Sequence, residues 1–148
     1  MEEMIKVTGW VRAYFNGELI SEKANTVTTV GKQQLAALLA SASAGTTWVT
    51  QMGFGSGTTA ANIADTALVT ELTATGYARQ TVNRTVTGAQ IQYQATLTNV
   101  STSATVNEVG LFNALTGGQL EARQVLASAV TLSSASDSLQ ITWQINLN

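Results

Sequence analysis

The sequence predicts an all-β fold, a jelly-roll-like antiparallel β-sandwich that carries one short α-helix. Three observations lead to this class. Apolar and polar residues alternate in several short segments, as in half-buried strands. Turn-forming residues separate these segments at short intervals. Charged residues make up only 11% of the chain, so Thr, Ser, Gln and Asn must cover the surface, and threonine suits a pleated sheet. We expect a single sandwich domain, residues 1–148.

The first predicted element is a hairpin that turns at Asn16-Gly17. Segments 5–15 and 18–23 flank this pair, and both central residues of a type I′ turn need positive φ, which Asn and Gly tolerate best. Residues 1–5 precede the first strand. We interpret them as a flexible arm that could reach a neighbouring subunit, with a frayed terminus as the alternative.

One helix is predicted at about residues 30–43. Leu35, Leu38 and Leu39 recur at the i, i+3 and i+4 spacing of a single helix face. Thr29 could cap the start of this helix and Gly45 could terminate it. We expect the helix to cover an open end or one face of the β-body.

The rest of the chain is predicted to form two hairpins and a closing strand. Gly88 supplies a turn residue for the first hairpin, and the Thr-Gly-Gly run at 116–118 supplies them for the second. The closing strand is the clearest, because apolar and polar residues alternate strictly along it. The predicted strands are 78–87, 89–100, 105–114, 119–126 and 139–147.

The composition argues against several classes of function. The chain has no Cys and no His, which removes thiolate zinc sites, cysteine nucleophiles and histidine acid–base chemistry. A net charge of −2 is unsuited to binding DNA or RNA directly. No apolar run approaches the ~20 residues of a membrane helix, and the start "MEEMIK" lacks the basic region of a signal peptide. We therefore expect no cofactor, no metal and no membrane partner.

The stretch "GFGSGTTAANIADTALVTEL", residues 53–72, is rich in glycine but does not match a nucleotide-binding loop. A P-loop needs a lysine after its last glycine, whereas Thr58 follows Gly57 here. A dinucleotide fingerprint needs G-x-G-x-x-G between a strand and a helix, and this stretch does not supply that pattern. We interpret the glycines as residues whose backbone freedom lets a strand leave its sheet and turn sharply.

The carboxylates could in principle serve a glycosidase without histidine, but nothing in their spacing pairs them. Glu108 lies in the apolar run 106–112, so we expect it to be buried and to need a partner. Asp65 has oxygen-bearing neighbours but not the spacing of a calcium loop. No catalytic or metal-binding residue is assigned. The acids considered are Asp65, Glu71, Glu108, Glu121 and Asp137, and the possible partners of Glu108 are Arg79, Arg84 and Arg123.

An interaction surface is predicted on the first strand. Trp10 and Tyr14 share a strand face with Lys6 and Arg12. Trp, Tyr and Arg are enriched at the centres of protein–protein interfaces, and the two aromatics could equally form a platform for a sugar. We predict Lys6, Trp10, Arg12 and Tyr14 as interface residues.

Several segments carry a recurring order of short motifs. They are "NTVTTVGKQQLAALLA" (25–40), the 53–72 stretch, "VNEVGLFNA" (106–114) with "GGQLEARQVL" (117–126), and "SDSLQITWQINL" (136–147). This order resembles that of a loosely related group of small tailed-bacteriophage virion structural proteins. In that group a helix leads to G-x-G-T-T and D-T-A-L-x-x-E, and a later E-x-G-L-F-N precedes a glycine turn and an amphipathic strand.

The resemblance implies a non-enzymatic protein of the virion, assembled in the host cytoplasm. We expect a capsid decoration (cement) protein that binds the major capsid protein and its own neighbours as a homo-oligomer, with a trimer favoured. A tail-fibre, baseplate or neck module, with carbohydrate binding for host attachment, is the alternative. An enzyme that uses carboxylates alone is the third hypothesis, which the missing histidine and the unpaired acids make remote.

Overall fold

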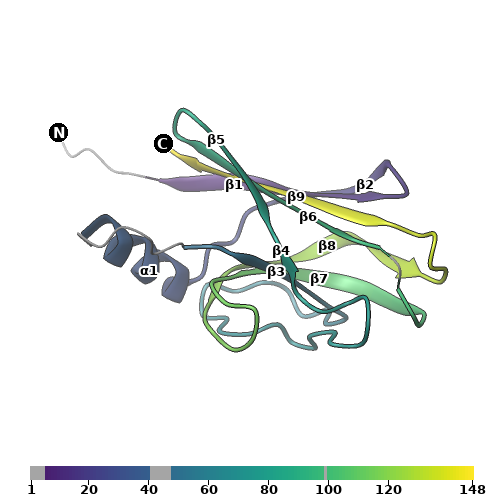
Figure 1. The fold of residues 1–148 in the computed structure, drawn as a ribbon. Coiled ribbons are helices and arrows are strands. Elements are labelled where there is room, and N and C mark those ends of the chain that lie inside the picture. Colours follow the sequence, from purple (N-terminus) through teal and green to yellow (C-terminus); the bar gives the residue numbers. More distant parts are fainter. Residues whose placement is uncertain (1–5, 41–47, 99) are drawn as a thin grey trace.

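The computed structural model describes residues 6–40, 48–98 and 100–148 (Figure 1). These residues form nine strands and one helix. The elements are β1 (Val7–Phe15), β2 (Glu18–Ala24), α1 (Thr29–Ala40), β3 (Gln51–Gly55), β4 (Gln80–Thr81), β5 (Asn83–Thr87), β6 (Gln90–Leu97), β7 (Ala104–Phe112), β8 (Leu120–Leu132) and β9 (Leu139–Leu147).

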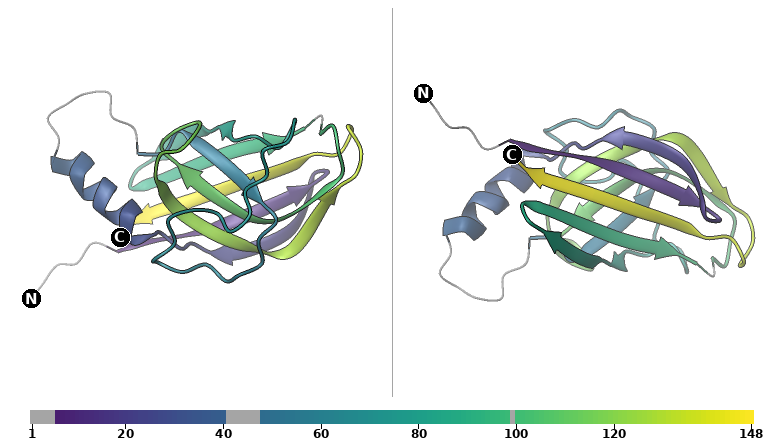
Figure 2. Two further views of the ribbon diagram at one scale, coloured as in Figure 1. Left: turned by 90° about the horizontal axis from the view of Figure 1, so that it is seen from below. Right: turned by 90° about the horizontal axis from the view of Figure 1, so that it is seen from above.

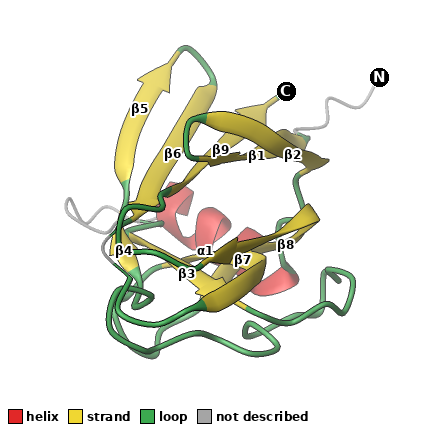
Figure 3. Ribbon diagram, turned by 90° about the vertical axis from the view of Figure 1, so that its right-hand side faces the viewer, coloured by secondary structure: helices red, strands yellow, loops and turns green. Residues whose placement is uncertain are grey.

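The strands form two antiparallel sheets that face each other (Figures 2 and 3). The first sheet has the order β2-β1-β9-β6-β5, and the second has the order β4-β3-β7-β8. Every pair of neighbouring strands is antiparallel. The predicted antiparallel sandwich with one helix is confirmed.

The core lies between the two sheets, and β9 contributes its largest side chain, Trp143. Along β9 the residues Leu139, Ile141, Trp143 and Ile145 have no exposed surface, which confirms the alternation seen in the sequence. Trp143 fills the centre of this row, and its indole Nε1 donates a hydrogen bond to Asn25 Oδ1 at 2.8 Å. A buried Trp needs such a partner for its N–H.

The three predicted hairpin turns are confirmed. Asn16 and Gly17 have φ values of 48° and 84°, as a type I′ turn requires. Gly88 joins β5 to β6 with a φ of 59°, and Gly117 and Gly118 lie in the connection from β7 to β8 with φ values of 61° and 69°.

Both sides of the sandwich are closed by chain that contacts the two sheets. On one side, β4 pairs with β3 of the four-stranded sheet and β5 pairs with β6 of the five-stranded sheet. Val82, between β4 and β5, donates its N–H to Thr50 O at 3.1 Å. On the other side, Arg123 N of β8 donates to Thr26 O at 3.0 Å, just after β2.

The helix begins where predicted, but its cap is a different residue. Thr28 Oγ1 accepts a hydrogen bond from Gly31 N at 2.9 Å, so Thr28 rather than Thr29 is the N-cap. The prediction of Thr29 was wrong because Thr28 is fixed by β8: its N–H donates to Glu121 O at 3.0 Å. Of the predicted range 30–43, residues 41–43 lie outside the described residues, as does Gly45.

The leucine face of α1 covers the sandwich only in part. Leu35 and Leu38 are half-buried against the core, whereas Leu39 is 77% exposed. Gly31 is the one buried residue of the helix, because its backbone lies against the Glu121 carbonyl where no side chain would fit. The helix therefore contacts the body through Gly31, Leu35 and Leu38, and it extends outward from one end (Figure 1).

Candidate functional site: an uncovered sheet face

The outer face of the five-stranded sheet is a polar surface built from cross-strand rows. Directly paired residues of antiparallel strands point to the same side, so the strand register defines each row. One row runs across the sheet through Thr85, Gln92, Gln144, Trp10 and Ala24. The next row runs through Asn83, Gln94, Thr142, Arg12 and Glu22.

Trp10, Arg12 and Tyr14 lie together on this face, as predicted from their alternation. The Arg12 guanidinium carbon lies 3.8 Å from the centroid of the Trp10 ring, a cation–π contact. Arg12 Nε also donates to Glu22 Oε2 at 2.7 Å, and this hydrogen bond raises the pKa of Arg12 above its ordinary value. The result is an aromatic ring and a cation held in fixed relative positions, both half-exposed.

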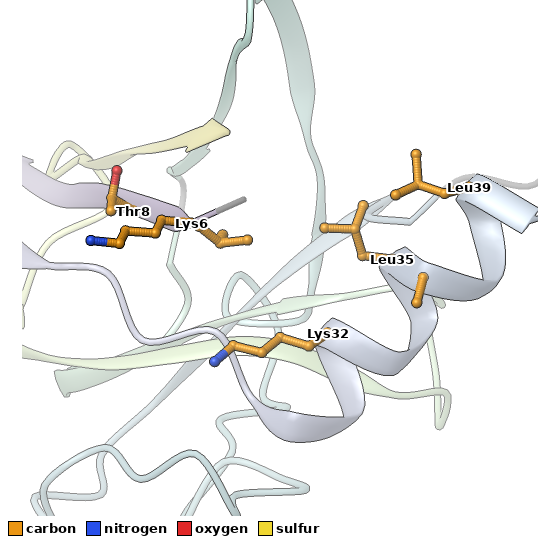
Figure 4. Close-up of a pocket in the computed structure, with 7 residues that line it drawn as sticks. Lys6, Thr8, Lys32, Leu35 and Leu39 are labelled. Carbon is orange, nitrogen blue, oxygen red and sulfur yellow. The ribbon is translucent and has the colours of Figure 1, made fainter. Parts of the chain in front are cut away.

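Lys6 is placed differently from the other three predicted interface residues. It precedes β1 and lines a groove of about 590 Å³ between the start of β1 and α1. Figure 4 shows Lys6 and Thr8 on one wall of this groove and Leu35 and Leu39 on the other. Sequence reasoning missed the groove. The available signal was Leu39, an apolar residue on the predicted helix face that is exposed in the structure and lines the groove. The groove residues are Lys6, Val7, Thr8, Lys32, Leu35, Ala36 and Leu39.

The opposite face of the molecule is occupied by the chain itself. Residues 56–79 run over the outer face of the four-stranded sheet (Figure 2, left). Their anchor is Glu108 of β7, whose side chain is fully buried. It accepts hydrogen bonds from the N–H groups of Gly57 (3.1 Å), Val69 (3.1 Å) and Thr70 (2.8 Å).

Arg123 is the partner of Glu108. It is one of the three arginines that the sequence offered for this role. Its Nε donates to Glu108 Oε2 at 2.8 Å, and neither side chain has exposed surface. Its two terminal nitrogens bind Asp65 Oδ2 (2.9 Å) and Thr59 O (2.8 Å) of the same connector. Burial alone would raise the pKa of Glu108, but the bonds from Thr70, Arg123 and Val69 outweigh it and hold the pKa below its ordinary value.

The strand leaves its sheet after Gly55, as predicted, but the glycines serve close packing and do not use the backbone freedom that was expected of a sharp turn. Gly53, Gly55 and Gly57 all have φ values outside the positive region, and β3 continues through Gly55, paired with Glu108 of β7. A Cβ on Gly57 would lie 2.6 Å from Glu108 Oε1. The glycines are therefore needed because they have no side chain, which lets the connector reach a buried carboxylate.

A second ion pair fastens the far end of the connector. Arg79 binds Glu71 through two nitrogens, at 2.6 and 3.0 Å, and lies 3.5 Å from the centroid of the Phe112 ring. Leu68 packs beside the pair with Phe112 and Leu120. The residues of the motifs D-T-A-L-x-x-E and E-x-G-L-F-N thus meet in one place, where they hold the connector to the sheet.

Among the described residues, four of the five acids considered from the sequence are bound by arginines or by backbone N–H groups. Asp65, Glu71 and Glu108 are engaged by arginines. Asp137 accepts hydrogen bonds from the backbone N–H groups of Ser133 and Ser134 in a surface turn. The part of the chain described here contains no cluster of three potential metal ligands. Nor does it contain a helix with both the length and the apolar character needed to cross a bilayer.

Glu121 is the exception, because it is buried without a partner. It lies at the irregularity where Leu111 pairs with Ala122 but Phe112 pairs with Leu120. Both of its carboxyl oxygens lack a hydrogen-bond partner among the described residues, and the nearby Trp48 N–H donates to Gly31 O at 3.0 Å. Burial raises the pKa of Glu121 to about 7, since the charged form is poorly solvated there.

We expect Glu121→Gln to abolish a pH dependence of stability. Because the folded-state pKa is raised from 4.5 to about 7, the folded chain binds the proton more tightly. The free energy of unfolding should therefore fall by about 3 kcal/mol as pH rises from about 4.5 to about 7. Urea unfolding of the wild type and of Glu121→Gln at pH 5, 6, 7 and 8 measures this difference, with the exposed Glu22→Gln as control. Parallel curves for wild type and Glu121→Gln would contradict the assignment.

Comparison with known proteins does not add to this site. No protein-family model and no curated protein matches the chain.

Proposed function

We propose that the chain is a structural protein of a tailed-bacteriophage virion, a capsid decoration protein that binds the major capsid protein and its own neighbours. The observation that supports this most directly is the asymmetry of the sandwich. Residues 56–79 cover the outer face of the four-stranded sheet, whereas no described segment lies over the outer face of the five-stranded sheet (Figure 2, right). The uncovered face carries Trp10, Arg12 and Tyr14.

The chemistry of this face suits many modest contacts. Amide and hydroxyl groups bind a neighbouring protein without requiring matched charges, and an Arg stacked on a Trp is typical of an interface centre. A decoration protein is held by contacts multiplied over many copies, so each one need not be tight. We propose a homo-oligomer, with a trimer favoured, located in the virion after assembly in the host cytoplasm. The role requires no catalysis, so we expect no turnover of any substrate.

We expect Trp10→Ala and Arg12→Ala to weaken binding to particles with little effect on folding. The exposed Arg12–Glu22 pair contributes at most about 1 kcal/mol to stability. An interface centre, in contrast, loses ~2 kcal/mol or more on truncation, roughly 30-fold in Kd. Co-sedimentation of the purified chain with particles that lack it measures binding, and thermal unfolding measures stability.

Leu115→Ala is the matched control for this experiment. Leu115 is 60% exposed but lies in the β7–β8 connection, on the other sheet. It should bind like the wild type. Unchanged binding by both Trp10→Ala and Arg12→Ala, or collapse of the fold in both, would show that the face is not the interface.

A tail-fibre, baseplate or neck module that binds carbohydrate is the second candidate. It is favoured by the row in which Trp10 lies between Gln144 and Ala24, since an aromatic ring beside an amide can stack on a sugar and hydrogen-bond to it. Specific binding on a glycan array that disappears in Trp10→Ala would support this candidate over the first.

A further inference from the structure

The outer edge of β5 is an unpaired strand edge. All five residues of β5 are exposed, and Val86 is 68% exposed. The strand is hydrogen-bonded to β6 on one side. In an antiparallel ladder, alternate residues direct their N–H and C=O groups to the opposite side. Among the described residues, these outward groups of β5 have no hydrogen-bond partner.

This edge has one of the features by which proteins block strand addition, the charge of Arg84, which pairs with the core residue Tyr93 and so lies on the inner side of the sheet. Such features are Pro, Lys, inward charges, bulges and covering segments. The chain contains no Pro, the β5–β6 register is unbroken, and Arg84 is the only charged residue in the strand. The other edge of the same sheet is β2, which faces β8 and is tied to it by Ser21 Oγ, an acceptor for Ala127 N at 2.7 Å.

We propose that β5 pairs with β5 of a second copy in an antiparallel register centred on Thr85. In this register Asn83 lies opposite Thr87, and Arg84 lies opposite Val86. The register is chosen by charge: centring on Arg84 would place two guanidinium groups directly opposite, which is unfavourable, whereas centring on Thr85 separates them. The exposed β-branched residues Thr85, Val86 and Thr87 suit such a pairing.

The pairing has a consequence for the uncovered face. Directly opposite residues in an antiparallel ladder lie on the same side of the sheet. The row that contains Thr85, Gln92, Gln144 and Trp10 would therefore continue from one copy into the other. The two Trp10 side chains would face the same direction, and a partner surface could be bound by both copies at once. A two-fold contact of this kind could join trimers to one another but could not itself make a trimer.

A single cysteine tests the register directly, because the chain has no native cysteine. Thr85→Cys places two thiols opposite each other across the two-fold axis, with Cβ atoms about 4.5–5.5 Å apart, and mild oxidation should give a covalent dimer. Asn83→Cys and Thr87→Cys are the matched controls. Each alone should remain monomeric on a non-reducing gel, whereas a mixture of the two should give a heterodimer. Equal cross-linking of all three single variants, or none at Thr85→Cys, would overturn the proposal.

Charge changes at Val86 provide a second measurement that does not depend on oxidation. A five-residue pairing is short, so we expect weak association of the wild type in sedimentation equilibrium. Val86→Glu places a carboxylate opposite Arg84 of the second copy, twice per dimer, and should strengthen association. Val86→Arg places like charges opposite each other and should abolish it. If both variants associate like the wild type, or if all remain monomeric, the edge is not a self-contact.

These experiments use the purified chain alone. Their failure would leave the particle-binding role of the Trp10 face standing, and failure of particle binding would leave the β5 contact standing.

Discussion

Replacing Arg123 by Met lowers the free energy of unfolding by about 3–5 kcal/mol at pH 7, because it leaves Glu108 charged and buried without its ionic partner. Arg123 and Glu108 have no exposed surface and are joined at 2.8 Å. The same change removes the bonds from Arg123 to Asp65 and Thr59 O, so the 56–79 connector loses its anchor. Chemical denaturation followed by tryptophan fluorescence measures the loss.

Two further variants separate the ion pair from general damage. Adding Glu108→Gln to Arg123→Met keeps an oxygen acceptor for Gly57 N and Thr70 N, loses the acceptor for Val69 N, and removes the unpaired charge. Because a stranded buried charge costs more than one lost hydrogen bond, the double variant should be more stable than Arg123→Met alone. Arg12→Met removes an exposed pair and should cost less than about 1 kcal/mol. A double variant less stable than Arg123→Met would indicate that the cost does not come from the stranded carboxylate.

Replacing Trp143 by Ala is expected to cost a similar amount, about 3–5 kcal/mol, because it empties the centre of the core. Trp143 has no exposed surface and lies in the middle of β9, between β1 and β6. Its loss also removes the bond to Asn25 Oδ1. With a total stability of ~5–15 kcal/mol for a domain of this size, the variant should be partly unfolded at 37 °C.

Trp10→Ala is the control for Trp143→Ala, since the two residues have the same side chain on opposite faces of the same sheet. It should unfold near the wild-type midpoint in thermal melts followed by circular dichroism. Equal losses in the two variants would mean that Trp10 supports the fold, and the outer face would then no longer be free to bind a partner.

The sequence predicted the elements whose signal is local. Strict alternation along 139–147 is sufficient to define β9 and its buried face, because a strand that is half-buried must alternate. Asn16-Gly17 and Gly88 were equally clear, because few other residues adopt positive φ in a tight turn. Trp10, Arg12 and Tyr14 could be placed on one face for the same reason of period-two geometry.

The sequence could not show which strands are neighbours. β9 lies between β1 and β6, and its residue Trp143 pairs with both Val11 and Tyr93. Alternation defines the face of a strand but carries no information about which distant strand it pairs with. β8 was predicted to end at residue 126 but continues to Leu132. The prediction stopped short because residues 127–129 are all exposed and interrupt the alternation.

The structural roles of the glycines, of Lys6 and of the buried acids could also not be predicted locally, because they depend on tertiary contacts. Gly57 is glycine because Glu108 approaches it from another strand, and no local pattern distinguishes this from a turn. Lys6 belongs to the groove beside α1 because the helix extends outward there. Glu121 is fully buried, and Gly31 of α1, ninety residues away in sequence, packs against its backbone.

Imaging of assembled particles at a resolution that shows strands would test the proposed role most directly. We predict density for the sandwich on the capsid shell, with the outer face of the five-stranded sheet, including Trp10 and Arg12, against the major capsid protein. Particles in which the chain is absent, or in which this face points into solvent while residues 56–79 make the contact, would contradict the account.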